Sequence, residues 1–284
     1  MEYYLGDKLI TANQVNFSVG KKVIIRDIGT EKMPFDIVDL KKASNNDVYP
    51  FLGQCIAVLG ASGTGKSTLF KLLSGLIKPT QGELLIPDLE NNHVLKQVEE
   101  GDVGFVQQHY PLSRNQSILA MLRLAAKQGK IKKEEQKDVI NSYLEKWGLY
   151  EHRNKYPIQL SGGQKQRVAI LEQLLCSHYF IIFDEPFSGL DVKNVEDVKL
   201  SFNEICCSND INTVIFSTHD IELAVEIADT IYIIGMEKDE AGNTVDGGTI
   251  IQKFDLKTMG LAWKPYSIEH KECSKEISEI IKTH

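Results

Sequence analysis

The segment that most constrains this chain is Gly60-Ala-Ser-Gly-Thr-Gly-Lys-Ser-Thr68, which has the phosphate-binding form G-x-x-x-x-G-K-[ST]. Before it, Cys55-Ile-Ala-Val-Leu59 is a short apolar run typical of a strand, and after it Leu69-Phe-Lys-Leu-Leu73 has apolar residues at helical spacing. A glycine-rich turn between a strand and a helix presents several N–H groups and the positive end of the helix to an anion. The sequence therefore predicts a nucleotide phosphate site in an α/β fold.

Individual residues of this loop have expected roles. The glycines allow a tight turn and a close approach of phosphate to the backbone. Lys66 is expected to bridge the β- and γ-phosphates, and Ser67 to ligate a magnesium ion. The candidate nucleotide-binding residues here are Gly60, Ala61, Ser62, Gly63, Thr64, Gly65, Lys66, Ser67 and Thr68.

A second candidate element is the apolar run Phe180-Ile-Ile-Phe183, which is followed directly by Asp184 and Glu185. A strand buried on both faces rarely ends in two carboxylates unless a cation or a proton is handled there. Asp184 is expected to hold magnesium, directly or through water. Glu185, just beyond the strand, could accept a proton from an attacking water molecule.

Between these two elements lies Leu160-Ser-Gly-Gly-Gln164, which precedes a helical stretch. A serine and two glycines at a helix start offer a hydroxyl and backbone N–H donors to an anion. Alone this pentapeptide is a moderate signal. Its position between a phosphate-binding loop and an Asp-Glu strand makes it a strong one.

Charge and cysteine usage exclude other classes of protein. The net charge of −7 disfavours a general nucleic-acid role, because such proteins usually carry a basic surplus. The five cysteines form no C-x-x-C pair, which favours a reducing cytosol. We expect no signal peptide at the N-terminus and no apolar run long enough to span a bilayer.

Together these motifs resemble the nucleotide-binding subunit of ATP-binding cassette (ABC) transporters, from about Leu9 to about Met236. In that resemblance Leu160–Gln164 is the signature, and Asp191 lies in the segment called the D-loop. His219 is the switch histidine. Gln108 is the glutamine of the Q-loop, with Gln107 as the neighbouring candidate.

The resemblance implies a division of labour between two copies. One copy's phosphate-binding loop, Asp184 and Glu185 hold MgATP, and the other copy's Ser161, Gly162, Gly163 and Gln164 close over the γ-phosphate. Asp191 acts across the interface. The implied catalytic residues are Glu185, His219 and Gln108, and the implied metal ligands are Ser67, Gln108 and Asp184.

The family fold implies a P-loop NTPase (RecA-like) core with a mainly parallel sheet, an N-terminal antiparallel β subdomain and a helical insert that carries the signature. The expected ATPase domain is 1–236, with the core at about 1–108 and 165–236, and the helical subdomain at about 109–164. Residues 237–284 form a short C-terminal extension. Expected strands include Val103–Val106, Thr213–Phe216 and Ile231–Ile234.

The resemblance implies a motor subunit at the cytoplasmic face of a membrane, with ATP and Mg²⁺ as cofactors. Its partners are a second copy or a close paralogue and a membrane permease, which binds around residues 109–125 and provides the only membrane contact. No direct nucleic-acid partner is expected. Import is favoured over export. The alternatives are a non-transport ATPase that acts on a ribosome, DNA or protein complex, and a scaffold that binds nucleotide without hydrolysis.

The chain departs from the family in two places. The position expected to hold an adenine-stacking aromatic is Val19, for which Phe17 or an early tyrosine could substitute. The stretch from Gly29 to Phe51 is longer than usual, which indicates an extended hairpin or loop, or else a partner contact.

Overall fold

The computed structural model describes residues 3–42, 53–88, 94–107, 112–177, 179–208 and 211–284. Its N-terminal part is an antiparallel five-stranded sheet in which β1 pairs with β2, β3 and β5, and β5 pairs with β6. Its strands are β1 (Tyr3–Val19), β2 (Lys22–Ile28), β3 (Phe35–Lys42), β5 (Gln81–Asp88) and β6 (Val94–Gln97). The expected antiparallel start of the chain is therefore confirmed over its described residues.

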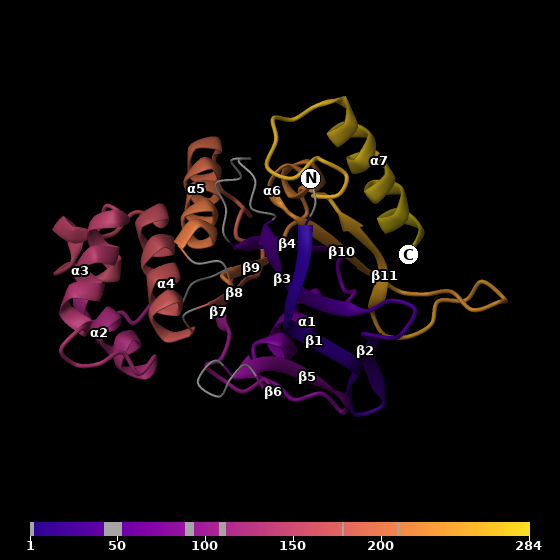
Figure 1. Cartoon of the computed structure of the whole chain (residues 1–284), viewed down its shortest axis with the longest axis horizontal. Coiled ribbons are helices and arrows are strands. Elements are labelled where there is room, and N and C mark those ends of the chain that lie inside the picture. The colour runs from indigo at the N-terminus through magenta and orange to yellow at the C-terminus, as the bar shows by residue number, and fades with distance from the viewer. Residues whose placement is uncertain (1–2, 43–52, 89–93, 108–111, 178, 209–210) are drawn as a thin grey trace.

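A six-stranded sheet forms the centre of the molecule, in the order β11-β10-β4-β9-β8-β7 (Figure 1). Every neighbouring pair in it is parallel except β10 and β11. Its strands are β4 (Gln54–Leu59), β7 (Gly104–Val106), β8 (Phe180–Phe183), β9 (Thr213–Ser217), β10 (Thr230–Gly235) and β11 (Thr249–Asp255). The expected mainly parallel sheet is confirmed, and parallel order brings the carboxyl ends of β4, β8 and β9 to one edge.

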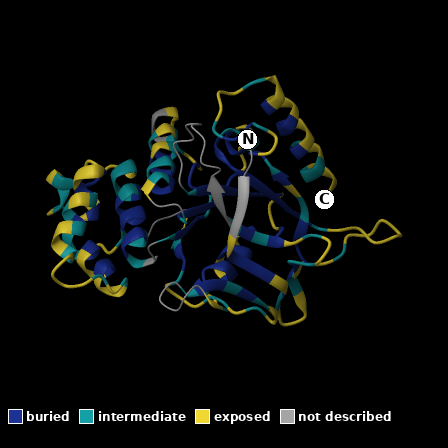
Figure 2. Ribbon diagram, in the orientation of Figure 1, coloured by how far each residue is buried: buried dark blue, intermediate teal, exposed yellow. Residues whose placement is uncertain are grey.

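The central sheet is buried on both faces, as its near-continuous apolar strands predict. Along β4, Cys55, Ala57 and Leu59 contribute to the core beneath the helices, whereas Ile56 and Val58 contribute to the core shared with the antiparallel sheet. This alternation follows from the two-residue period of a strand. Figure 2 shows the resulting buried strands at the centre of the molecule.

The helical part of the chain lies to one side of the sheet (Figure 1). It consists of α2 (Ile118–Gln128), α3 (Gln136–Lys146), the short helices η1 (Tyr150–His152) and η2 (Pro157–Gln159), and α4 (Gly162–Ser177). Apolar residues recur at helical spacing along α3 and at its C-cap, and Ile140, Leu144 and Trp147 are buried in the core. The remaining helices are α1 (Lys66–Leu73), α5 (Val192–Ser208), α6 (Ile221–Ile227) and α7 (Ile268–Thr283).

The C-terminal residues add to the same body. Strand β11 pairs with β10, and α7 buries Cys273 and Ile277 in the core. The backbone N–H of Met236 donates to the carbonyl of His284, which holds the end of α7 near β10. None of the helices in the described part of the chain is both long and apolar enough to cross a bilayer.

The extra length between Gly29 and Phe51 contains β3, which pairs with the first half of β1 from Tyr3–Lys42 to Ala12–Phe35. The described part of this stretch is thus an additional strand, while residues 43–52 lie outside the described residues. The five cysteines are free thiols, with Cys55, Cys206 and Cys273 buried.

Candidate functional site

The phosphate-binding loop joins β4 to α1. Gly65 is the N-cap of α1 with a φ of 95°, and it supplies no side-chain cap to the first turn. The left-handed backbone favours glycine here, and a Cβ at Gly65 would also lie 2.7 Å from Cδ1 of Ile25 on β2, which would have to shift. The N–H groups of the first turn therefore stay available to an anion.

The Lys66 side chain folds over the loop and is largely buried. Its Nζ donates to the carbonyl oxygens of Gly60 at 2.8 Å and Ala61 at 2.9 Å. Burial lowers the pKa of Lys66, and the nearby carboxylates of Glu185 and Asp184 oppose that shift. A positive charge held here faces the same edge of the sheet as the two acidic residues.

Asp184 follows β8 and is held by the neighbouring strand β9. Its Oδ1 accepts a hydrogen bond of 2.8 Å from Oγ of Ser217, the last residue of β9. The backbone N–H of Asp184 donates to the carbonyl of Val106 at 3.0 Å. Asp184 is therefore fixed between β7 and β9 at the edge where the loop lies.

Glu185 has a φ of 52°, a left-handed conformation that is unusual for a residue with a side chain. Its N–H donates to Oγ of Ser217 at 3.0 Å. Nε2 of His219 lies 3.1 Å from Oε1 of Glu185, close enough for an ion pair when the histidine is protonated. The contact lacks hydrogen-bond geometry, and Oε1 is a buried atom that accepts no hydrogen bond of standard geometry from the described residues.

The surroundings of Glu185 suit a base. Burial raises its pKa, while the charges of His219 and Lys66 oppose the rise. A carboxylate with a raised pKa is a stronger proton acceptor than one in water. His219 itself is exposed and lies just before Asp220, the N-cap of α6, whose side chain accepts from the N–H of Leu223.

The signature residues form the start of α4. The N–H of Ser161 donates to Oε1 of Gln164 at 3.0 Å, and the N–H of Gln164 donates to Oγ of Ser161 at 3.3 Å. This reciprocal pair is a capping box, which stabilises the helix start. Gln164 is thus engaged with its own helix, while Ser161 and Gly162 are exposed.

The structure brings together only some of the predicted residues. The phosphate-binding loop, Asp184, Glu185 and His219 gather at one edge of the sheet. Within the described residues, no hydrogen bond or ion pair joins Ser161–Gln164 to that loop. Asp191 is exposed, and Gln108 lies outside the described residues. The neighbouring Gln107 is exposed at the end of β7.

The donor set fits a small divalent cation. The Ser67 hydroxyl and the Asp184 carboxylate are both oxygen donors, which Mg²⁺ prefers. Ser67 is exposed at the start of α1, and of the two Asp184 carboxylate oxygens Oδ1 is the one that accepts from Ser217. The Ser67 hydroxyl and the Asp184 carboxylate therefore have oxygen available to an ion.

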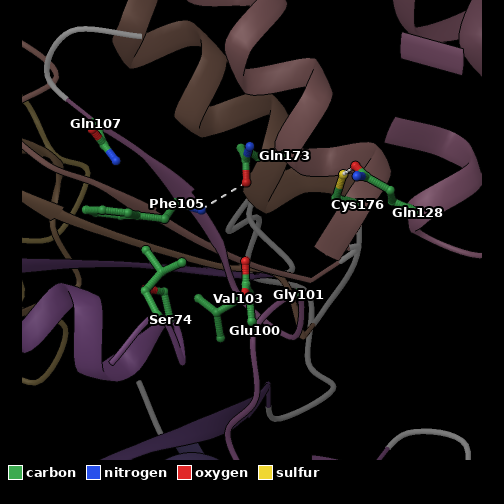
Figure 3. Close-up of a pocket in the computed structure, with 10 residues that line it drawn as sticks. Ser74, Glu100, Gly101, Val103, Phe105, Gln107, Gln128, Gln173 and Cys176 are labelled. Carbon is green, nitrogen blue, oxygen red and sulfur yellow. Dashed lines mark hydrogen bonds between the residues drawn. The ribbon is translucent and has the colours of Figure 1, made fainter. Parts of the chain in front are cut away.

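A cavity of about 550 Å³ lies apart from the loop, between the core and the helical part (Figure 3). Leu76, from the segment after α1, and Phe105 and Gln107, from the β7 end, line one side of it. Gln128 and Cys176, from the ends of α2 and α4, line another. The N–H of Phe105 donates to Oε1 of Gln173 at 3.0 Å across this region.

Comparison with known proteins identifies the family. The family model described as ABC transporter matches residues 45–188. The chain belongs to the ABC transporter family. It is 35% identical over 198 residues to the sulfate/thiosulfate import ATP-binding protein CysA 1 of Agrobacterium fabrum, covering 68% of this chain and 56% of that protein. It is 37% identical to the arginine transport ATP-binding protein ArtM of Bacillus subtilis, covering 63% of this chain and 75% of that protein.

The chain spans about half the length of the first ABC transporter relatives it matches. A solved structure of cbiO1 from Clostridium perfringens, part of the ABC transporter complex cbiONQ, matches with a TM-score of 0.67 at 24% identity. That match covers 89% of this chain and 91% of the other. It confirms the predicted ABC ATPase fold.

Three polar residues of this ABC family chain were not among the predicted site residues, the buried Ser217 and Gln166 and the half-buried Gln173. Ser217 bonds both Asp184 and Glu185, and its position two residues before His219 could have marked it. Gln166 and Gln173 on α4 bond to backbone near the site. A lone glutamine in a helical stretch carries no such signal in sequence.

Proposed function

We propose that this chain is the ATP-hydrolysing motor subunit of an ABC transporter. The observation that carries the proposal is the grouping of Lys66, Asp184, Glu185 and His219 at one edge of the parallel sheet beside an uncapped helix start. A scaffold that only binds nucleotide would not need a half-buried carboxylate beside a histidine at that edge. The relatives named as import ATP-binding proteins support transport over a role on a ribosome or DNA.

In this proposal the residues divide the work. The N–H groups of α1 and Lys66 bind the phosphates, and Glu185 accepts the proton of the attacking water at Oε1. His219 contacts the γ-phosphate and holds its orientation. Ser67, Asp184 and Gln108 hold Mg²⁺, which neutralises phosphate charge when it is bound.

The signature works in a second copy of this chain or a close paralogue. Ser161, Gly162 and Gly163 are presented at the exposed start of α4, where an anion from another subunit can meet the helix N-terminus. Gln164 supports them through the capping box rather than by direct contact. ATP bridges the two copies, and hydrolysis separates them, a two-state change biased by a ligand.

The partner is a membrane permease, and the subunit is peripheral on the cytoplasmic face. Instead of the expected contact around residues 109–125, we place the permease helix at the cavity lined by Leu76, Phe105 and Gln107, since it borders both the core and the helical part. A helix seated there would sense rotation of the helical part relative to the core.

The direction is solute import. Relatives named for sulfate/thiosulfate import support it. To test the proposal, a tagged chain is purified from detergent-solubilised membranes of its source and the co-purifying integral membrane protein is reconstituted with it. ATP-dependent solute uptake into vesicles supports the proposal. ATP hydrolysis that moves no solute in either direction contradicts it.

A further inference from the structure

The signature helix α4 is bonded directly to the segment that carries Glu185. The Gln166 side chain is buried, with 3% of its surface exposed, and its Nε2 donates to the backbone carbonyl of Pro186 at 3.2 Å. Pro186 is the residue after Glu185. A side chain two residues beyond the capping box therefore contacts the backbone of the acidic loop.

A second glutamine on α4 also makes a hydrogen bond from its side chain to the backbone of the core, this time as the acceptor. Gln173 accepts from the N–H of Phe105 on β7 at 3.0 Å. Gln166 and Gln173 are seven residues apart, close to two helical turns, so both lie on one face of α4. Hydrogen bonds therefore join that face of α4 to the backbone of the core at two points. One is Pro186 in the loop after β8, and the other is Phe105 in β7.

The loop after β8 holds an unfavourable backbone conformation. Glu185 has a φ of 52°, and such a conformation persists only where its surroundings over-determine it. The Ser217 hydroxyl accepts from the Glu185 N–H on one side of Pro186. On the other side, the centroid of the Phe187 ring lies 5.7 Å from that of Phe202 and 5.8 Å from that of Phe216. Between these two residues, the Pro186 carbonyl accepts a hydrogen bond from Gln166.

We infer that Gln166 is a positioning residue for hydrolysis. Its hydrogen bond holds the Pro186 carbonyl, so that Oε1 of Glu185 stays beside His219. When α4 moves, the same bond moves the peptide after Glu185 with it. The inference rests on the proposed role of Glu185 as the base. In this inference Gln166 acts through its hydrogen bond to the backbone carbonyl of Pro186.

The test substitutes Gln166→Met, which keeps the side-chain length and removes the donor. The matched control is Gln54→Met, because Gln54 is also buried, with 5% exposed, and its Nε2 donates to the carbonyl of Val38 at 2.9 Å. Binding of a fluorescent ATP analogue and the melting temperature are measured for both. We expect similar losses of melting temperature and unchanged nucleotide affinity.

The two variants should differ in turnover. Misplacement of a catalytic group by 1 Å costs up to about 100-fold in rate, so Gln166→Met should lower kcat by about 10- to 100-fold with KM unchanged. Gln54→Met should keep kcat within about twofold of wild type. Equal kcat in the two variants overturns the inference, whereas a wild type without hydrolysis overturns the proposed function instead.

A double substitution separates positioning from general damage. In the Glu185→Gln background, Gln166→Met should change single-turnover hydrolysis little, because the group it positions is already lost. If Gln166→Met costs the same factor in both backgrounds, Gln166 has only a structural role. This readout does not depend on how much either variant is destabilised.

Discussion

Nε2 of His219 and Oε1 of Glu185 lie 3.1 Å apart, although the two residues follow different strands, β9 and β8. The two side chains meet because β8 and β9 pair in parallel, which brings the ends of both strands to the same edge of the sheet. The Ser217 hydroxyl ties both strand ends together. The chemistry of the site therefore rests on the register of two neighbouring strands.

Replacing Glu185 with Gln should reduce kcat by about 10²–10⁴, the usual contribution of a positioned general base. Phosphate release under saturating ATP measures it. Affinity for ATP should stay at the wild-type value, because the phosphates are bound by α1 and Lys66. Wild-type turnover in this variant removes Glu185 from the role of base.

Replacing Lys66 with Ala should weaken ATP binding by about 10-fold or more, since hydrogen bonds to a charged group contribute about 1.5–3 kcal/mol. Titration with a fluorescent ATP analogue measures it. The control is Lys71→Ala, at an exposed lysine in the last turn of the same helix, which should bind ATP with the wild-type affinity. Equal affinities in the two variants would speak against the phosphate-binding assignment.

Replacing Ser161 with Arg should block closure of two copies, because the larger side chain occupies the exposed start of α4. Nucleotide binding to a single copy should be unchanged. The control is Glu134→Arg, an exposed position in the helical part before α3. The account fails here if Ser161→Arg hydrolyses ATP at the wild-type rate.

Glu172 on α4 should make stability depend on pH, since burial raises its pKa to about 7 from the usual 4.5. Because the pKa of Glu172 is higher in the folded state, its contribution to the free energy of unfolding is fully present below pH 4.5 and is lost as the pH rises through 7. The loss is up to about 3 kcal/mol from this shift. Denaturant unfolding of the wild type at pH 5.5 and pH 8 measures it.

Glu172→Gln should remove that loss, so the variant should gain stability relative to wild type at pH 8 and much less at pH 5.5. The exposed Glu151→Gln should keep the wild-type difference between the two pH values. Parallel pH profiles for wild type and Glu172→Gln would show that the Glu172 carboxyl titrates normally.

Replacing Val19 with Tyr should tighten ATP binding at least about fivefold, because stacking of a base on an aromatic ring contributes about 1–3 kcal/mol. Val19 is 62% exposed at the end of β1, whereas Phe17 is packed against the core and is engaged elsewhere. The control is Val94→Tyr, at a similarly exposed valine on β6. If the affinity of Val19→Tyr for ATP is unchanged, the adenine ring does not lie beside residue 19.

The sequence predicts much of this fold because short apolar runs rich in β-branched residues, such as Ile231–Ile234, are typical of strands buried on both faces. It also predicts Lys66 and Asp184, whose types and neighbours specify their chemistry. It does not predict Gln166 or the φ of Glu185, since both depend on packing between α4 and the loop after β8. The extended hairpin that the extra length between Gly29 and Phe51 indicated agrees with β3, which pairs antiparallel with β1.

In the proposed cycle, two copies of the chain close around ATP. The most direct measurement is the mass of the Glu185→Gln variant in solution, by size exclusion with light scattering, with MgATP and with MgADP. The account predicts twice the 32.0 kDa mass of one chain with MgATP and a single chain with MgADP. A single chain under both conditions, in protein that binds ATP, would contradict it.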